Sequence, residues 1–449
     1  MSSSSRVLST SMNVLAATTV LVTAVFLGEA AGQTSDPVAG SWRQWGGPTR
    51  DFMSEAVGLA DSWNEDGPPV VWTRPLGLGH SSIVVDGGVL YTMYRRSDES
   101  ARRGGRGNRG GGVEASEVVI AMDAATGETK WEYEYPSEPL NFRFGAGPHS
   151  TPLVVGDLVF TVGTNKQMHA LTKETGALVW SLDLIDEYGA PPTLIRPAVQ
   201  AGYGGNPLAF EDTIILQAGG EGQAVMALRQ RDGALVWRNG DFLIANAAPL
   251  LIDVDGQQQV VIVGGQTING LDPTTGEILW SHPHDTDGDM NNTMPLWGPD
   301  NVLFVSSAYN QGSRALKLTR QGADTNVEEL WFTGRMKLMF VNAIRIGDFV
   351  YGTDGGFGPA FLTALDINTG AAGWQERGFG RSSLVHADGK VFLLDEDGDL
   401  VLGRVSPTGF TTLSRAHIFD TTAWTVPTVV GTTLYARDRE KIVALDVGR

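Results

Sequence analysis

The chain has 449 residues, a formal net charge of −18 and no cysteine. The acidic balance argues against nucleic acid or an anionic membrane surface as the main partner. The lack of cysteine excludes disulfides, a thiol nucleophile and a lipid-acceptor thiol. The 57 glycines and 42% hydrophobic residues fit many turns between short strands.

Residues 1–32 have the pattern of a secretory signal peptide. Arg6 gives a weakly positive start, residues 14–27 form an apolar run, and Ala30-Ala31-Gly32 supplies the small residues that a signal peptidase needs. The apolar run is shorter than the roughly 18 residues that a membrane span requires. An uncleaved N-terminal anchor is the alternative. We therefore expect export to the bacterial periplasm or the cell exterior, with no integral span after signal removal.

Residues 33–67 are expected to form an irregular extension packed on the domain that follows. Trp42, Trp45 and Trp63 lie among Gly, Pro and Asp, which is typical of a segment pinned to a surface by aromatic side chains. We favour packing over the closing part of the domain, and a platform for carbohydrate or another ligand is the alternative.

Residues 101–112 differ in composition from the rest of the chain. They consist mainly of glycine and arginine, which cannot bury a core, so we expect a disordered loop between two strands. RNA binding is the alternative for such a run. Export and the acidity of the chain favour a solvated loop.

One motif recurs along the chain at intervals of 43 to 57 residues. It is an apolar strand, an Asp-x-x-Thr-Gly turn and a second strand that ends in tryptophan. In the copy Leu271–Trp280, Gly276 can take the positive φ that a tight hairpin requires. A residue that repeats in this way is typical of a packing girdle that docks one repeat on the next, so we assign a structural role to Trp72, Trp131, Trp180, Trp237, Trp280, Trp331 and Trp374.

A second pattern, two apolar strands around a Gly/Asp turn, precedes each copy, and its eight occurrences give eight units of four strands. The eighth unit ends with its third strand at residues 441–446, and residues 69–73 supply the missing fourth. We therefore predict an all-β fold over residues 68–449, an eight-bladed β-propeller of four-stranded antiparallel blades closed by pairing of N- and C-terminal strands. Blade seven lacks the tryptophan at Phe410–Leu413, so its packing should be looser or compensated.

The repeated Ala-Leu-Asp-x-x-Thr-Gly-x-x-x-Trp motif and the opening Trp42–Pro48 resemble those of PQQ-binding-like β-propeller repeat proteins. This superfamily includes quinoprotein alcohol dehydrogenases, which use pyrroloquinoline quinone (PQQ), and the BamB-like propellers. The resemblance covers nearly all of the exported chain. It implies either a non-catalytic binding or scaffold module, or a PQQ-dependent oxidoreductase acting on an alcohol or sugar. The second class implies an axial calcium, an Asp base and often a pair of adjacent cysteines. This chain has no cysteine.

Loops that enter the innermost strands of a propeller converge near its axis, where function is usually sought. The positions two residues before each expected innermost strand form an axial ring, which also includes Gly204 and Phe340. Its mixed polar members fit a small polar or anionic ligand, and the candidate binding residues are His80, His149, Asn246, Asn292, Arg381 and Trp424. Arg381 could hold a PQQ carboxylate by a bidentate contact. The ring contains no carboxylate, and Asp395–Asp399 is expected to be a hairpin turn of blade seven.

A loop between blades four and five carries His282, His284, Asp285 and Asp287. Imidazole and carboxylate groups both bind divalent ions, so these residues are a candidate metal site. A solvated acidic loop is the alternative, because Met290 and Leu296 stand where a calcium loop needs Gly and Glu.

The chain shows no Gly-x-Ser-x-Gly elbow and no phosphate-binding loop, and we assign no catalytic residue. We expect an exported binding or scaffold module for a protein or small polar ligand that requires no cofactor. A PQQ-dependent oxidoreductase with calcium is the alternative.

Overall fold

The computed structural model describes residues 40–96, 115–138, 145, 147–192, 202–356 and 358–449. The chain divides into two units, Met1–Gly32 and Gln33–Arg449, and every described residue belongs to the second. The expected signal peptide at residues 1–32 and the expected Gly/Arg loop at residues 101–112 lie outside the described residues. No helix in the described ranges has the length and apolar character needed to cross a bilayer.

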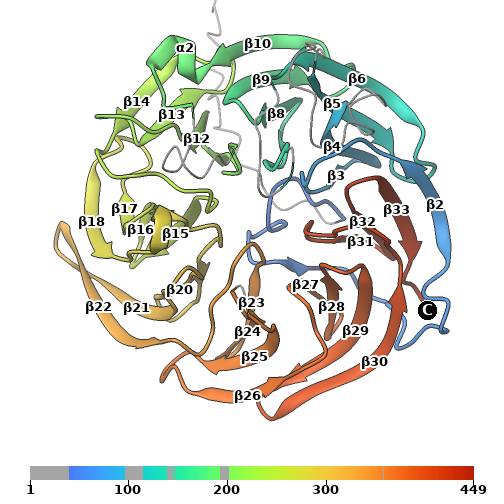
Figure 1. Ribbon diagram of the computed structural model, residues 1–449. Coiled ribbons are helices and arrows are strands. Elements are labelled where there is room, and N and C mark those ends of the chain that lie inside the picture. The colour runs from blue at the N-terminus through green and yellow to red at the C-terminus, as the bar shows by residue number, and fades with distance from the viewer. Residues whose placement is uncertain (1–39, 97–114, 139–144, 146, 193–201, 357) are drawn as a thin grey trace, which may run out of the picture. The chain divides into compact units, whose positions relative to one another are not determined.

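Eight blades are arranged in a ring, each with four antiparallel strands (Figure 1). In blades one to seven these four strands follow sequence order from the centre outwards, whereas the outermost strand of blade eight comes from the N-terminal part of the chain. Blades one and two contain β3 (Val84–Asp86), β4 (Val89–Arg96), β5 (Ser116–Asp123), β6 (Thr129–Pro136), and β7 (Leu153–Val155), β8 (Leu158–Val162), β9 (Gln167–Thr172), β10 (Leu178–Asp183). Blades three and four contain β11 (Leu208–Phe210), β12 (Thr213–Gln217), β13 (Val225–Arg229), β14 (Leu235–Asn239), and β15 (Leu250–Val254), β16 (Gln257–Val263), β17 (Thr267–Leu271), β18 (Ile278–Pro283).

The remaining blades follow the same order, except for the outermost strand of blade eight. Blades five and six contain β19 (Leu296–Trp297), β20 (Val302–Ser306), β21 (Ser313–Gln321), β22 (Asp324–Thr333), and β23 (Ala343–Ile346), β24 (Phe349–Asp354), β25 (Phe361–Asp366), β26 (Ala372–Glu376). Blades seven and eight contain β27 (Ser382–Ala387), β28 (Lys390–Asp395), β29 (Asp399–Ser406), β30 (Gly409–His417), and β31 (Thr428–Val430), β32 (Thr433–Arg437), β33 (Lys441–Asp446), β2 (Val70–Pro75). Helix α2 (Leu184–Tyr188) and the short helix η1 (Asp287–Asp289) lie in loops.

Pairing of N- and C-terminal strands closes the ring. The early strand β2 is antiparallel to β33 and forms the outer edge of blade eight, with Trp72 opposite Ala444. The two strands lie side by side at the right of Figure 1, β2 in blue and β33 in red. The predicted eight-bladed architecture and its closure are confirmed.

The repeated tryptophans lie where one blade meets the next. Trp131 of blade one donates its Nε1–H to the carbonyl of Lys173 in blade two, at 3.0 Å. Gly176 of the same blade-two turn has φ +69°, and a Cβ there would lie 2.5 Å from the Trp131 ring. The turn glycine therefore provides both the left-handed conformation and the room for the indole. Trp280 differs, because its Nε1–H bonds to Gln259 Oε1 of its own blade, at 2.7 Å.

Blade seven compensates for its missing tryptophan with a residue from the N-terminal extension. Ser414 lies opposite Leu402, where other blades place tryptophan opposite Ala or Gly. Its Oγ accepts a hydrogen bond from the Trp63 backbone N–H at 2.9 Å and donates one to the Trp63 carbonyl at 3.2 Å. The Trp63 indole stacks on Phe392 with 6.3 Å between ring centroids. The extension thus supplies the aromatic ring that the repeat lacks.

The described part of the extension reaches further than the closing blade. Trp42 bridges to Val85 in blade one, and the Arg43 carbonyl accepts the Val154 N–H of blade two at 2.9 Å. Strand β1 (Met53–Ser54) adds a parallel fifth strand to the inner edge of blade seven. These contacts lie near the ends of innermost strands, whereas the axial ring precedes their starts. The extension therefore covers the face opposite the axial ring.

Candidate functional site

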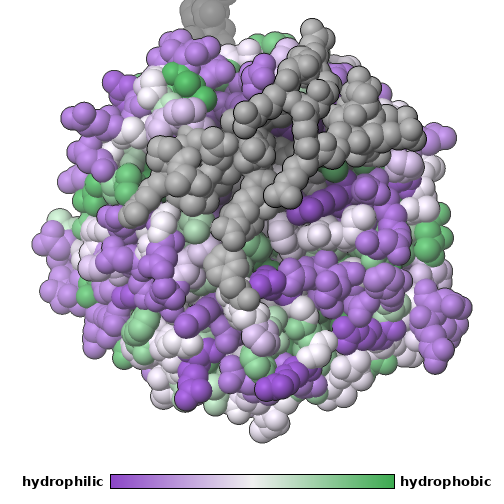
Figure 2. Space-filling view, viewed as in Figure 1, coloured by the Kyte–Doolittle hydropathy of each residue, from purple (hydrophilic) through white to green (hydrophobic). Residues whose placement is uncertain are grey.

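Four residues of the predicted axial ring form an aromatic cluster. The imidazoles of His80 and His149 stack at 5.3 Å with an angle of 10° between their planes. The Trp424 indole lies 5.2 Å from His80 and 5.0 Å from Phe340. These residues come from loops leading into blades one, two, six and eight, so the convergence of those loops assembles the cluster. Hydrophilic residues predominate on the visible part of the surface in this view (Figure 2).

A carboxylate that the sequence analysis missed joins this cluster. Glu396 lies in the turn between β28 and β29, and its Oε1 accepts a hydrogen bond from Arg381 Nη1 at 2.6 Å. Its other oxygen accepts the Trp424 Nε1–H at 3.1 Å. None of the predicted ring residues is a carboxylate, but this hairpin turn also reaches the ring face and adds one. Glu396 thereby links two of the predicted residues, Arg381 and Trp424.

The two asparagines of the ring are used within blades three to five. Asn246 Oδ1 accepts the Gly204 N–H at 2.9 Å. Asn292 Nδ2 donates to the Tyr309 hydroxyl at 3.4 Å. Both amides therefore hold neighbouring loops together.

Desolvation and positive charge keep His149 neutral near pH 7. Desolvation lowers the pKa of His149 to about 4, outweighing a hydrogen bond to the backbone of Gly145 that raises it. The charge of Arg439 lowers this pKa further. Arg439 stacks on Trp424, with its Cζ 5.0 Å from the ring centroid, and its Nε lies 3.3 Å from His80 Nε2. One arginine therefore borders both histidines of the cluster.

A hollow of about 450 Å³ lies beside the cluster, between blades seven and eight. Its wall combines Leu78, Thr421, Thr422 and Arg439 with the acidic side chains of Glu396, Asp397, Asp420 and Glu440. We call it the blade 7/8 pocket. Because Glu396 and Arg439 belong to both, the cluster and the pocket form one continuous polar site on the ring face.

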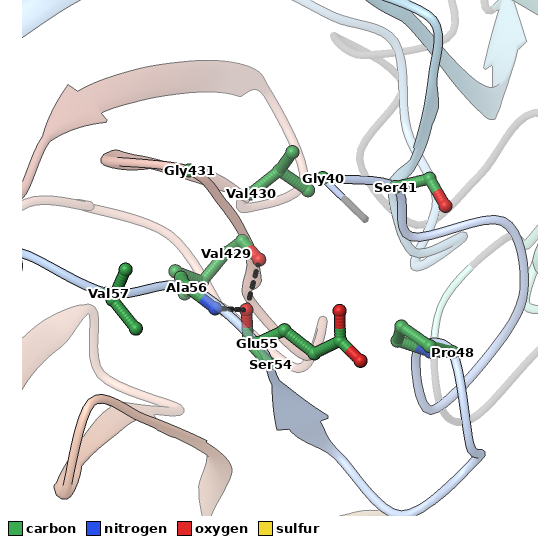
Figure 3. A pocket seen from close by; sticks show the side chains of 10 residues that line it. All are labelled: Gly40, Ser41, Pro48, Ser54, Glu55, Ala56, Val57, Val429, Val430 and Gly431. Atoms are coloured by element: carbon green, nitrogen blue, oxygen red, sulfur yellow. Dashed lines mark hydrogen bonds between the residues drawn. The ribbon is translucent and has the colours of Figure 1, made fainter. Parts of the chain in front are cut away.

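The opposite face carries a smaller hollow of about 170 Å³ between the extension and blade eight (Figure 3). Ser54 Oγ donates to the Val429 carbonyl at 2.8 Å and accepts the Ala56 N–H at 3.2 Å, which fixes one wall. Figure 3 shows Glu55 with its carboxylate extending toward Pro48. Most of the other lining residues are small or apolar, so this hollow offers fewer polar groups than the ring face.

The predicted metal residues are not brought together. His284 is buried and its Nε2 lies 2.9 Å from Ser307 Oγ, whereas His282 Nε2 lies 3.5 Å from Glu329. The Asp285 carbonyl accepts a hydrogen bond from Gln311, and the Asp287 carboxylate accepts one from Asn310. Among the described residues, no group of three or more His, Cys, Asp or Glu is arranged to hold a metal ion.

His284 should make the protein sensitive to acid. Its Nδ1 is buried without a hydrogen-bond partner among the described residues, and desolvation lowers its pKa to about 3. The unfolded chain binds this proton near pH 6.5 and the folded protein only near pH 3, so stability falls as the pH drops through this window. We expect a His284→Asn variant to lose stability less steeply, by about one proton, or about 1.4 kcal/mol per pH unit. Urea unfolding at a series of pH values measures both slopes, and equal slopes would contradict the assignment.

The described residues of the axial site do not fit a calcium-bound quinone. Arg381 donates from Nε at 2.8 Å and from Nη2 at 2.6 Å to the Gly356 carbonyl. The guanidinium edge that could make a bidentate contact with a carboxylate is therefore already occupied. The carboxylate of Glu396 is shared between Arg381 and Trp424. A quinone would have to displace these contacts.

Comparisons with known proteins give two kinds of relative. A family model described as outer membrane protein assembly factor BamB matches residues 53–182 and 115–375. The BamB of Yersinia pestis is 26% identical over an alignment of 254 residues, which covers 53% of this chain and 54% of that protein. The chain therefore spans about half the length of the curated relative that it matches.

Solved structures resemble the propeller. BamB from Moraxella catarrhalis superposes with a TM-score of 0.54 and 17% identity, over 84% of this chain and 97% of that one. A quinohemoprotein alcohol dehydrogenase from Comamonas testosteroni superposes with a TM-score of 0.60 and 13% identity, over 91% and 81% of the two chains. At these identities the likeness shows the fold alone.

Proposed function

The chain belongs to the BamB-like family of PQQ-repeat β-propellers, and from this premise we propose that it is an exported, non-catalytic binding or scaffold module for a protein or small polar ligand. The matching relative is named for the assembly of outer membrane proteins, which is a role of this class. Export places the module in the periplasm or outside the cell. Cell fractionation tests export, and recovery of the protein only in the cytoplasm would contradict it. N-terminal sequencing of the exported protein then shows whether residues 1–32 are removed or kept as an anchor.

The hydrogen bonding of the axial site favours a binding role over catalysis. The side chains of Arg381, Glu396 and Trp424 are held by hydrogen bonds within the protein, with Glu396 shared between the other two. Side chains that are fixed before any ligand arrives form a rigid surface for recognition. An open position for a metal or a free base is what catalysis would need.

Two arms of one experiment test this role. In the first, a photo-crosslinking amino acid replaces Thr422 in the blade 7/8 pocket, and Asp232 in an outer turn of blade three serves as the control position. We expect adducts in cells from position 422 that an excess of wild-type protein suppresses. Equal adducts from both positions, or none, would contradict a specific binding face.

The second arm distinguishes binding from redox catalysis. The purified protein is supplied with calcium and titrated with PQQ while tryptophan fluorescence and dye-linked alcohol oxidation are followed. We expect no saturable quenching at tens of micromolar PQQ and no dye reduction, because Arg381 is already committed to Gly356 and Glu396. Saturable quenching that Arg381→Ala weakens, together with dye reduction, would instead make the protein a PQQ-dependent oxidoreductase.

A further inference from the structure

The blade 7/8 pocket has the size of a small-molecule site and an uneven set of charges. Its volume of about 450 Å³ lies within the range of about 300–1,000 Å³ that is usual for ligand pockets. Two of its four carboxylates have cationic neighbours. Glu396 pairs with Arg381 at 2.6 Å, and Asp420 lies 3.5 Å from Lys441 Nζ.

The other two carboxylates are not compensated by the protein. Asp397 and Glu440 line the same pocket from the turns β28–β29 and β32–β33 and are exposed. Within the described ranges of the chain, neither carboxylate takes part in an ion pair or a side-chain hydrogen bond. Two negative charges are therefore available to a cationic ligand.

Arg439 provides a positive charge in the same wall. Its guanidinium stacks on the Trp424 ring at 5.0 Å and contacts His80 Nε2 at 3.3 Å, so its position is fixed by rings rather than by an ion pair. It makes no salt bridge with a carboxylate in the described part of the chain, although four carboxylates line the pocket with it. A guanidinium held in this way can bind a carboxylate of a ligand.

The geometry points to a ligand of matching charge: a small zwitterion with two ammonium groups and one carboxylate, as in a basic amino acid or a short basic peptide. Asp397 and Glu440 receive the ammonium groups, and Arg439 receives the carboxylate. This assignment rests on the proposed binding role and names the ligand class of that site. Such a ligand can enter from solvent on the ring face, because Asp397 and Glu440 are exposed.

Calorimetric titration with three probes separates the charges of the ligand. L-Lysine carries all three groups, L-lysine amide lacks the carboxylate, and diacetyl-lysine lacks both ammonium groups. We expect saturable binding of L-lysine and at least about tenfold weaker binding of either analogue, which corresponds to a loss of about 1.4 kcal/mol of binding free energy. No saturable heat from L-lysine or from glycyl-L-lysine would overturn the proposal. Tighter binding of the dipeptide than of L-lysine would identify peptides as the source of the ligand.

Variants assign each charge to a residue. We expect the Arg439→Gln variant to bind L-lysine and L-lysine amide with equal affinity. The double variant Asp397→Asn, Glu440→Gln should no longer bind L-lysine more tightly than diacetyl-lysine. Arg404→Gln is the matched control, because Arg404 is exposed and pairs with Asp61 at 2.7 Å, outside the pocket lining. Unchanged probe preferences in the pocket variants would overturn the proposal. Crosslinks at position 422 without binding of any probe would reject the zwitterion and leave the binding role intact.

Discussion

Replacing Trp237 with alanine is expected to lower the free energy of unfolding by about 3–5 kcal/mol, as for other buried tryptophans. Trp237 is 8% exposed and joins blade three to blade four. Its Nε1–H bonds to the Pro273 carbonyl at 3.0 Å, and the turn residue Gly276 lies directly against its ring. The variant therefore loses apolar burial, a hydrogen bond and the contact between two blades. Urea unfolding followed by circular dichroism measures the change.

Two further variants show whether this loss comes from the contact between blades. Val236→Ala is the matched control, because Val236 is the neighbouring residue of β14 and is 49% exposed, so a change within about 0.5 kcal/mol is expected. Gly276→Ala places a methyl group 2.4 Å from the Trp237 ring at a φ of +76° and should also destabilise. Trp237→Ala and Gly276→Ala disrupt the same contact between the Trp237 ring and the turn. The destabilisation of the double variant should therefore be smaller than the sum of the two single effects. Full additivity would contradict this account.

Trp63→Ala is expected to lower the free energy of unfolding by about 2–3 kcal/mol, although Trp63 lies outside the repeats. Its indole stacks on Phe392, and its backbone is held on both sides by Ser414 Oγ. Without the indole, Phe392 loses the aromatic partner that the corresponding residues of other blades find in their own tryptophan. Thermal unfolding of wild type and variant measures the loss.

A rescue experiment separates this role from simple surface burial. In the Trp63→Ala background, Ser414→Trp with Leu402→Ala rebuilds the pairing of tryptophan and alanine that Trp374 and Ala364 make in blade six. We expect this triple variant to regain part of the lost stability. In wild type, Ser414→Trp alone should destabilise, because the new indole competes with Trp63. If the triple variant regained no stability and Ser414→Trp alone were neutral, Trp63 would not take the place of the missing blade-seven tryptophan.

The fold could be predicted because its information is local and repeated. Each copy of the motif specifies a turn glycine and a tryptophan at fixed spacing, and the eighth copy lacks one strand that the N-terminal region supplies. The docking of Trp63 could not be predicted, because the extension has no periodic pattern. Its partner Phe392 lies more than 300 residues away in the chain. The sequence of blade seven therefore shows that a tryptophan is missing, but not which residue takes its place.

The axial site was predicted only in part, for a topological reason. Each antiparallel blade sends two segments to the ring face, the loop that enters the first strand and the turn between the second and third strands. Counting back from the innermost strands finds the first kind, which holds His80, His149, Arg381 and Trp424. It misses the second kind, which holds Glu396, and the corresponding turn of blade eight, which holds Arg439. Sampling both segments of every blade would have found the residues that link the cluster to its pocket.

The pairing of β2 with β33 sets an order of assembly during synthesis. Blades one to seven can form as soon as their own strands leave the ribosome, since the contacts within each blade are local. Strand β2 is made early, but its partner is the last strand of the described chain, and Val70 and Val71 mark an apolar edge that stays unpaired until then. Loss of only residues 441–446 would therefore leave an N-terminal edge open to other chains, far from the deletion in sequence.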